Sequence, residues 1–450
     1  MSKNALDTDD MRGLVWKLAL PSMLAQFISV LYSIVDRMYI GNIPEIGDAA
    51  LAGVGVCGPI VTLISSFAFL VGIGGAPLVS IRLGARDEKG ARRVLANAFL
   101  MMLVLAGMLT AAAYFLKERL LLWFGASEGI FIYAEEYMSI YVLGTAFALI
   151  AAGMNQFIIC QGFAKSGMAS VALGAVLNII LDPVFIFGLD MGVKGAALAT
   201  VLSQMASAFF VLFLLFQRMP IRITFGDYHW KIVQSILMVG FTPFIIIAFD
   251  NVLIISLNMV LRQYGGEQVD MLLTCNTILQ SFMLLITMPL GGITGGTQTI
   301  LGFNIGARRQ DRIFRAMRAI IGMCLIFCTI MFVAANTVPE IFVRIFTKEP
   351  ENISLAVQMV HRYTLGVIPL AVQYELVDGF TGMGMARFSI FCSLFRKLVY
   401  MGCVLFIPRV TDIMNVFYAE PISDILGTVM TVSVFFLLAK KRIEGIEGTN

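Results

Sequence analysis

Apolar stretches long enough to cross a lipid bilayer are the feature that most limits what this 450-residue chain can fold into. A helix rises 1.5 Å per residue, so roughly 20 apolar residues span the hydrocarbon core. Twelve such stretches lie near residues 14–40, 50–80, 94–116, 131–157, 163–189, 193–217, 232–262, 271–302, 315–337, 353–381, 388–410 and 413–439. With 59% hydrophobic and only 14% charged residues, the composition excludes a set of soluble domains. The sequence therefore predicts an all-α membrane protein with twelve transmembrane helices.

Basic residues indicate which side of the membrane the loops face. Most of the 32 Lys and Arg lie in short loops on one side, which also holds both ends of the chain, and the largest groups fall at 82–93 and 308–318. Cytoplasmic loops of membrane proteins carry such an excess. We therefore expect both termini in the cytoplasm, and this topology explains the basic runs without a nucleic-acid partner.

An internal repeat divides the chain into two halves. Gly84-Ala85-Arg86 matches Gly306-Ala307-Arg308, and Pro21 matches Pro243, each at a separation of 222 residues. The same offset holds across six helices, which predicts two six-helix lobes, 1–222 and 223–450. Six is an even number, so both lobes enter the membrane in the same direction. Parallel repeats of this kind are typical of secondary transporters, with a substrate cavity between the lobes.

Acidic residues inside membrane helices are candidates for function, because a charge there must face a cavity or a partner. In the first half, Asp36, Tyr137, Asp182 and Thr200 each lie roughly 6–10 Å from the outer end of a helix at 1.5 Å per residue. Asn178 precedes Asp182 by four residues and shares its helix face. We predict that these five side chains meet at one level of the membrane.

The chemistry of this group suits a proton or a hard monovalent cation. A buried carboxyl holds a proton more tightly than one in water, and carboxylate, amide and hydroxyl oxygens also bind Na⁺. Pro183 removes the backbone donor that would use the carbonyl of Ile179, which frees another oxygen. The Na⁺ ligands would be Asp36, Asn178, Asp182 and Thr200. The structural alternative is that Asp36 pairs with Arg37 and that Asp182 belongs to an Asp-Pro turn.

The second half has not kept this cation group. At the same offset, Asn258 replaces Asp36 and Val404 replaces Asp182. The membrane helices of this half instead carry Asp250, Glu375 and Asp378. These acids either recognise substrate or form a second proton path, or they pair structurally with a basic residue. The available basic residues are Arg387, Arg396 and Lys397.

Several short motifs resemble the multidrug and toxic compound extrusion (MATE) family over essentially the whole chain. In order, they are Leu20-Pro21, Val35-Asp36 with Gly41, the two loops Leu83-Gly-Ala-Arg and Ile305-Gly-Ala-Arg, Asn178-x-x-x-Asp182-Pro183, Gly195-Ala-Ala-Leu-Ala-Thr200 and Pro421-Ile-Ser-Asp424. The resemblance, which is strongest to the bacterial drug-efflux branch, implies an antiporter of the plasma (inner) membrane. Such an antiporter expels cationic or amphipathic organic compounds in exchange for H⁺ or Na⁺. We expect a monomer in membrane lipid, with no cofactor besides the coupling ion.

The resemblance also implies roles for particular residues. The cation ligands of family members fall on Asp36, Asn178, Asp182 and Thr200, with Tyr137 beside them. Asn155 matches a family substrate-cavity position. Another branch uses acids of the seventh and tenth helices: Asp250 fits the first of these, whereas neither Glu375 nor Asp378 aligns with the second.

Three other functions are less consistent with the residues. A lipid or lipid-linked oligosaccharide flippase of the same superfamily would need a more basic cavity than the few basic residues within the spans provide. An enzyme is not expected, because the chain has two histidines, no His-Glu-x-x-His and no phosphate-binding Gly-x-x-x-x-Gly-Lys-Ser/Thr loop. A channel would show flux that needs no counter-ion and does not saturate.

Overall fold

The computed structural model describes residues 6–8 and 10–445, and all regular structure within these residues is helical. In the first half the helices are α1 (Met11–Gly41), α2 (Gly47–Gly84), α3 (Glu88–Trp123), α4 (Glu128–Ile159), α5 (Ala164–Pro183), the π-turn η1 (Val184–Gly188), α6 (Gly192–Phe213) and the π-turn η2 (Leu214–Arg218). The expected cytoplasmic placement of the termini concerns residues 1–5 and 446–450, which lie outside the described residues.

In the second half the helices are α7 (Trp230–Tyr264), η3 (Gly266–Gln268), α8 (Val269–Gly306), α9 (Gln310–Thr337), α10 (Pro339–Val343), α11 (Pro350–Tyr363), η4 (Thr364–Gly366), α12 (Val367–Gly382), α13 (Ala386–Val410), η5 (Ile413–Tyr418), α14 (Ala419–Val434), η6 (Phe435–Ala439) and α15 (Lys440–Glu444). Over the described part of the chain these elements form twelve apolar spans, each long enough to cross a membrane. The predicted all-α membrane fold is therefore confirmed.

Outward-facing apolar side chains agree with a lipid environment. On α3, Met108, Phe115 and Trp123 are all exposed, Phe115 to 82%. Exposed apolar side chains in such number would be costly in water but are favourable against lipid tails. The helix exteriors thus support the twelve-span interpretation independently of span length.

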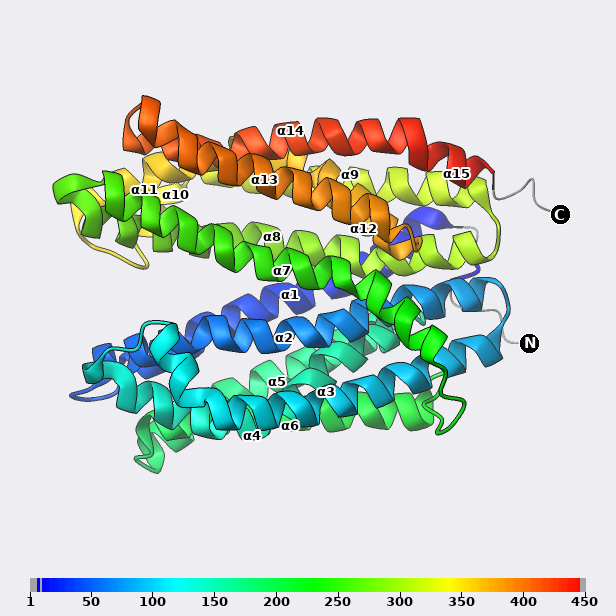
Figure 1. The fold of residues 1–450 in the computed structure, drawn as a ribbon, viewed down its shortest axis with the longest axis horizontal. Helices are drawn as coiled ribbons and strands as arrows, with labels where there is room; N and C mark the ends of the chain where they lie inside the picture. Colours follow the sequence, from blue (N-terminus) through cyan, green and yellow to red (C-terminus); the bar gives the residue numbers. More distant parts are fainter. Residues whose placement is uncertain (1–5, 9, 446–450) are drawn as a thin grey trace. The chain divides into compact units, whose positions relative to one another are not determined.

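The helices group into two compact units, most of which are Leu20–Ile247 and Ala248–Asn450. Residues 6–8 belong to the first unit and the start of α1, up to Ala19, to the second, so the chain passes between the units before α1, inside α1 and inside α7. Figure 1 shows α2–α6 of the first unit lying side by side. The predicted lobe boundary between residues 222 and 223 separates sequence repeats, and these compact units do not test it.

The repeat is visible in the backbone. Helices α2 and α8 end at Gly84 and Gly306, which are 222 residues apart. The arginines two residues later, Arg86 and Arg308, both adopt left-handed backbone, with φ of 59° and 55°. A left-handed residue directly after a helix ends it by turning the chain. The matched Gly-Ala-Arg loops therefore build the same helix-ending turn in both halves.

Small residues bring the helices of the first unit into close contact. A Cβ atom on Gly72 of α2 would lie 2.6 Å from the carbonyl oxygen of Gly153 on α4. A Cβ atom on Gly240 of α7 would lie 1.8 Å from the carbonyl oxygen of Leu70 on α2. Small residues allow membrane helices to pack backbone against backbone, where packing rather than the hydrophobic effect holds helices together. The first part of α7 is thus fixed on α2.

The connector between the two halves, residues 219–229, is bound to the first unit. Gln161 donates to the carbonyl oxygen of Ile221 at 3.1 Å and accepts from its N–H at 2.8 Å. Asn97 donates to the carbonyl oxygen of Asp227 at 3.2 Å and accepts from the N–H of His229 at 3.0 Å. Both amide side chains are almost fully buried. The connector therefore follows a defined path.

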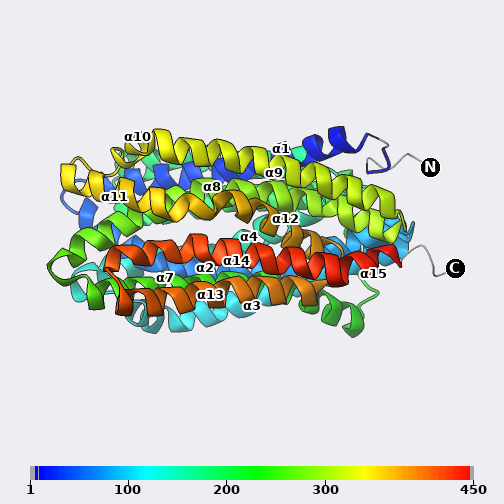
Figure 2. The ribbon, with the colours of Figure 1, turned by 90° about the horizontal axis from the view of Figure 1, so that it is seen from above.

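In the second unit, α12 packs against α8, α9 and α14, and α13 lies beside α14. Figure 2 shows α13 and α14 running together along their length. The tenth span consists of α11 and α12 joined by η4, and the twelfth begins at η5 and continues through α14. Near these interruptions, α11, α13 and α14 bring together the polar side chains of Tyr363, Arg396, Glu420 and Asp424.

Gly240→Ala tests the close packing of α2 and α7. The added methyl group overlaps the Leu70 carbonyl, so we expect the free energy of unfolding to fall by roughly 1–3 kcal/mol. The melting temperature of the protein purified in detergent measures this loss. Gly107→Ala is the matched control, because no atom lies within 4 Å of its added Cβ. Equal melting temperatures for the two variants would contradict this packing.

Candidate functional site

The carboxyl groups of Asp36 on α1 and Asp182 on α5 lie within hydrogen-bonding range of each other. Asp182 is fully buried, and Asp36 is partly buried. Two ionised carboxylates this close repel each other strongly where water is excluded. The pair is therefore stable only with a proton or a cation between its oxygens.

Polar side chains from α4, α5 and α6 surround this acidic pair. Asn178 Nδ2 donates to Asp182 Oδ1 at 3.2 Å and lies 3.5 Å from Thr200 Oγ1. Thr200 also makes a hydrogen bond with the hydroxyl of Tyr137, whose side chain is buried. The structure thus brings together all five residues of the predicted first-half group: Asp36, Tyr137, Asn178, Asp182 and Thr200.

Three oxygens of this group have no hydrogen-bond partner among the described residues. They are Asp36 Oδ1, Asn178 Oδ1 and Asp182 Oδ2, all of them buried. Buried polar atoms are nearly always satisfied, so converging unsatisfied oxygens indicate a missing positive partner. Carboxylate, amide and hydroxyl oxygens are all acceptors for H⁺ or Na⁺. The residues present therefore fit either ion.

The structural alternatives account for only part of this arrangement. Arg37 has an exposed side chain and interacts with Asp36 electrostatically. Helix α5 does lose its regular pattern at Pro183, continuing as the π-turn η1. Neither feature explains why the Asp182 carboxyl faces Asp36 and Asn178. An Asp-Pro turn alone would have no need of a second carboxyl from α1.

The sequence analysis did not identify every polar residue near the pair. Tyr32 lies one turn before Asp36 and within electrostatic range of both acids. Tyr141 stacks on Tyr137, with ring centroids 6.0 Å apart, and makes a hydrogen bond with Gln204 of α6. Tyr32 could have been found from its spacing of four residues from Asp36, which places it on the same helix face. No sequence signal links Gln204 to Tyr141.

Asn155 lies within the first unit, buried between α4 and α5. Its Oδ1 accepts from Ser170 Oγ at 3.2 Å, and its Nδ2 is 3.4 Å from the carbonyl oxygen of Gly167. These bonds join the two helices. The structure does not bring Asn155 into contact with the residues around Asp36 and Asp182.

Asp250 forms an ion pair with Lys397 of α13. The Lys397 side chain is only 2% exposed, whereas that of Asp250 is 50% exposed. A buried ammonium is costly without a counter-charge, so this pair stabilises α13 against α7. The sequence analysis offered three basic partners for the second-half acids. One of them, Lys397, pairs with Asp250.

Glu375 and Asp378 lie on α12. Asp378 bonds to α8, whereas Asp250 pairs with α13. Asp378 accepts from Thr294 of α8 at 2.5 Å and makes a further hydrogen bond with Gln298. Glu375 is buried, and its Oε1 has no partner within the described residues. The three predicted second-half acids therefore do not form one group.

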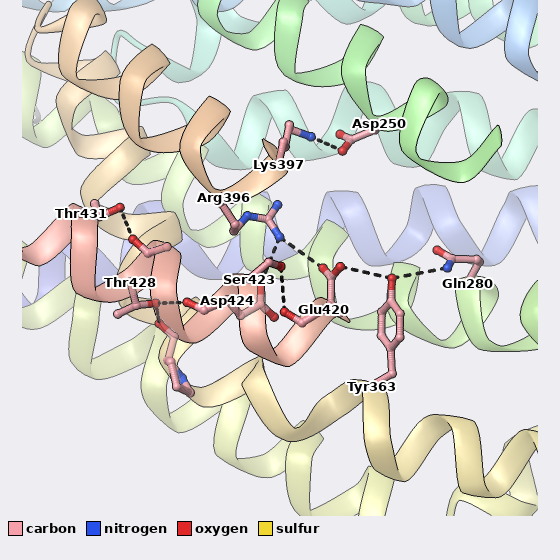
Figure 3. Close-up of polar contacts among 12 residues, drawn as sticks. Asp250, Gln280, Tyr363, Arg396, Lys397, Glu420, Ser423, Asp424, Thr428 and Thr431 are labelled. Carbon is pink, nitrogen blue, oxygen red and sulfur yellow. Dashed lines mark hydrogen bonds and ion pairs between the residues drawn. The ribbon is translucent and has the colours of Figure 1, made fainter. Parts of the chain in front are cut away.

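Arg396 of α13 is the centre of a polar group that the sequence analysis did not predict. Its Nη1 lies 3.2 Å from Glu420 Oε1 and 3.0 Å from Asp424 Oδ1, both on α14 (Figure 3). Tyr363 of α11 donates to Glu420 Oε2 at 3.3 Å. Glu420 lies near the start of a span, where an acid is ordinary, so the sequence did not single it out.

A family model, MatE, matches residues 21–184 and 244–403, one stretch in each half of the chain. Together these stretches cover well over half of the chain. Two similar proteins have related names. "Multidrug export protein MepA" of Staphylococcus haemolyticus is 26% identical over 75% of this chain and 74% of its own length. "Probable multidrug resistance protein NorM" of Thermotoga maritima is 25% identical over 84% of this chain and 81% of its own length.

Solved structures share the fold. One is described as "Outward-facing conformation of a multidrug resistance MATE family transporter of the MOP superfamily", with a TM-score of 0.91, 22% identity, and coverage of 100% of this chain and 99% of the other. A MOP superfamily transporter from Pyrococcus furiosus, for which a reversed polarity of the binding pocket suggests a different function, also has a TM-score of 0.91, with 23% identity and 99% coverage of each chain. Together with the MatE match, the twelve spans and the repeated halves, these likenesses show that the chain belongs to the MATE family of multidrug efflux transporters.

Proposed function

We propose that this protein is a cation-coupled antiporter of the plasma membrane, which exports cationic or amphipathic organic compounds in exchange for H⁺ or Na⁺. The observation that carries the proposal is the acidic pair Asp36 and Asp182 within the membrane spans, which together with Asn178 has three buried oxygens without a partner among the described residues. Related proteins named for multidrug export support the class of substrate. The basic loops at 82–93 and 308–318 support cytoplasmic termini.

The coupling ion would act through its different affinity for two conformations of the transporter. A ligand shifts a conformational equilibrium only by the difference in its binding free energy between the states. Ion binding between Asp36 and Asp182 removes the repulsion that otherwise forces these carboxyls apart. The conformation that holds α1 and α5 together is therefore favoured when the ion is bound, and the drug is released in that conformation.

The half-exposed carboxylate of Asp250 supports a role in attracting a cationic substrate. Its partner Lys397 is buried and cannot cover the exposed oxygens. The basic side chains of the second unit also argue against a flippase for anionic lipid-linked substrates. Arg396 and Lys397 are both engaged with carboxylates. Their charges are thus compensated within the protein, whereas a phosphate-binding cavity needs free positive charge.

Asp36→Asn and Asp182→Asn test the role of the acidic pair. Each variant removes one exchangeable charge, so we expect ethidium export from energised cells to fall by at least about tenfold, the effect of roughly 1.4 kcal/mol of lost ion binding. Asp190→Asn is the matched control, because Asp190 lies exposed just beyond the same helix end. Unchanged export in both variants, at equal protein levels in the membrane, would refute the proposed site.

Separate gradients distinguish the two coupling ions and exclude a channel. In proteoliposomes of the wild-type protein, either an imposed pH gradient or an imposed Na⁺ gradient should drive saturable uptake of ethidium against its own gradient. Uptake that needs neither gradient and does not saturate would contradict an antiporter. If both gradients fail while the protein still binds ethidium, coupling by H⁺ or Na⁺ is wrong.

Thr200→Val tests whether the hydroxyl is an ion ligand. Na⁺ coupling predicts that the apparent Na⁺ affinity for driving ethidium uptake falls by about tenfold, since one oxygen ligand is lost. Proton coupling predicts little change in pH dependence, because the carboxyls hold the proton. Thr200→Ser keeps the hydroxyl and is the control. A loss of transport in Thr200→Ser equal to that in Thr200→Val would show that shape, and not the oxygen, matters.

A further inference from the structure

Buried charge in the second unit lies on the helices that correspond to those of the Asp36–Asp182 site. At the offset of 222 residues, α7, α11, α13 and α14 correspond to α1, α4, α5 and α6. The second unit places polar side chains on all four: Asp250 on α7, Tyr363 on α11, Arg396 and Lys397 on α13, and Glu420 and Asp424 on α14. Figure 3 shows two sets of contacts among them: Lys397 points to Asp250, and Arg396 points to Glu420 and Asp424. Tyr363 repeats Tyr141 of the first half at this offset, whereas none of the charged residues repeats an acid or base there.

The charges of this group do not balance. Lys397 and Asp250 form one pair and cancel each other. Arg396 faces two carboxylates, Glu420 and Asp424, with a single guanidinium. Within these ion pairs, one negative charge is left without a counter-charge if every group is ionised. An uncompensated charge within a membrane span is disfavoured, which favours a proton on one of the two carboxyls.

Hydrogen-bond donors identify which carboxyl is charged. Glu420 accepts from Arg396 at Oε1 and from the Tyr363 hydroxyl at Oε2, so each of its carboxylate oxygens accepts a hydrogen bond. Asp424 accepts from Arg396 at Oδ1 only, at 3.0 Å. Its Oδ2 is buried and has no partner in the described part of the chain. Ionised carboxylates need donors at both oxygens, which favours Glu420 as the charged group and Asp424 as the neutral one.

Other ionisable side chains around Asp424 cannot supply the missing positive charge. They are Tyr363 on α11, Tyr374 on α12, Tyr400 on α13 and Cys328 on α9. Phenols and thiols are uncharged near neutral pH. The described residues also include no group of three or more His, Cys, Asp or Glu that could hold a metal ion.

The space beside Asp424 favours a proton over a larger ion. A Cβ atom on Gly366 would lie 2.9 Å from Asp424 Oδ2 and 2.7 Å from the Cα of Pro421. Backbone therefore closes one side of the unpartnered oxygen, which favours a proton there over a hydrated or six-coordinate cation. Arg396 and Glu420 are 16% and 15% exposed, whereas Asp424 is 0% exposed. The partly exposed Arg396 and Glu420 thus lie between Asp424 and the surface.

We propose that Asp424 is an exchangeable proton site in the second unit, distinct from the Asp36–Asp182 pair. With the proton bound at Oδ2, Arg396 is paired chiefly with Glu420. When that proton leaves Oδ2 for water, the Asp424 carboxylate shares the guanidinium with Glu420, which strengthens the bridge between α13 and α14. No other bond changes. The proposal does not depend on which ion the first unit takes, or on whether it takes one.

Infrared difference spectroscopy on the full-length protein in lipid tests this assignment. A pH series is recorded with isotope-labelled aspartate, in the background Asp36→Asn with Asp182→Asn, so that the acidic pair contributes nothing. We expect the carbonyl band of a protonated aspartic acid at neutral pH. Asp424→Asn should abolish that band, and Asp190→Asn should leave it unchanged. A band that persists in Asp424→Asn, or no such band in the background protein, would overturn the proposal.

Glu420→Gln gives a second, independent readout. This variant keeps Asp424 but removes the competing carboxylate, so Arg396 can pair with Asp424 alone. Asp424 then ionises, and its protonated band should be lost at neutral pH even though the residue is present. If Asp424 served only in packing, the Glu420→Gln substitution would leave the carbonyl band of the protonated aspartic acid unchanged. Because this variant leaves Asp424 intact, it also tests the proposal if Asp424→Asn fails to fold.

Discussion

The exclusion of water from charged side chains within the membrane spans is the constraint on which the polar structure of this protein depends. Every buried ionisable group must find an opposite charge, a set of donors or a proton. In the first unit, Asp36 and Asp182 meet without any base among the described residues that contact them directly, which is why we propose an exchangeable ion there. In the second unit, Arg396 and Lys397 supply most of that charge within the protein.

The two halves have kept their backbone and changed their chemistry. The helix-ending turns at Arg86 and Arg308 have the same geometry, yet Val404 stands where the first half has Asp182. A turn depends on local backbone conformation, which any duplicated segment inherits. A buried charge depends on partners from three or four helices, so it is lost or gained together with them. This difference explains why one repeat can hold a mobile ion while its counterpart holds arginine and lysine.

Hydropathy was sufficient to predict the twelve spans, because each span is a property of one stretch of sequence. The group around Asp36 could be predicted because the depth of each residue in the membrane follows from its position along its own helix. Spacing also predicted that Asn178 and Asp182 share a face. The contact of Arg396 with Glu420 could not be predicted, since it depends on how α13 packs against α14 and no periodicity encodes that. For the same reason the sequence could not assign partners to the second-half acids: Asp250 pairs with Lys397 of α13, whereas Asp378 accepts from Thr294 of α8.

The path of the chain limits where the two units can adjust to each other. Gln161 and Asn97 hold the connector, residues 219–229, to the first unit with four hydrogen bonds to backbone atoms. The connector lies within the first unit, whereas two helices, α1 and α7, each belong partly to one unit and partly to the other. Pro21 and Pro243 lie within a few residues of the unit boundaries in these helices and remove a helical hydrogen bond from each. Asp36 is on α1 and Asp250 is on α7, so a bend at either proline would move a carboxylate that the transport proposal requires.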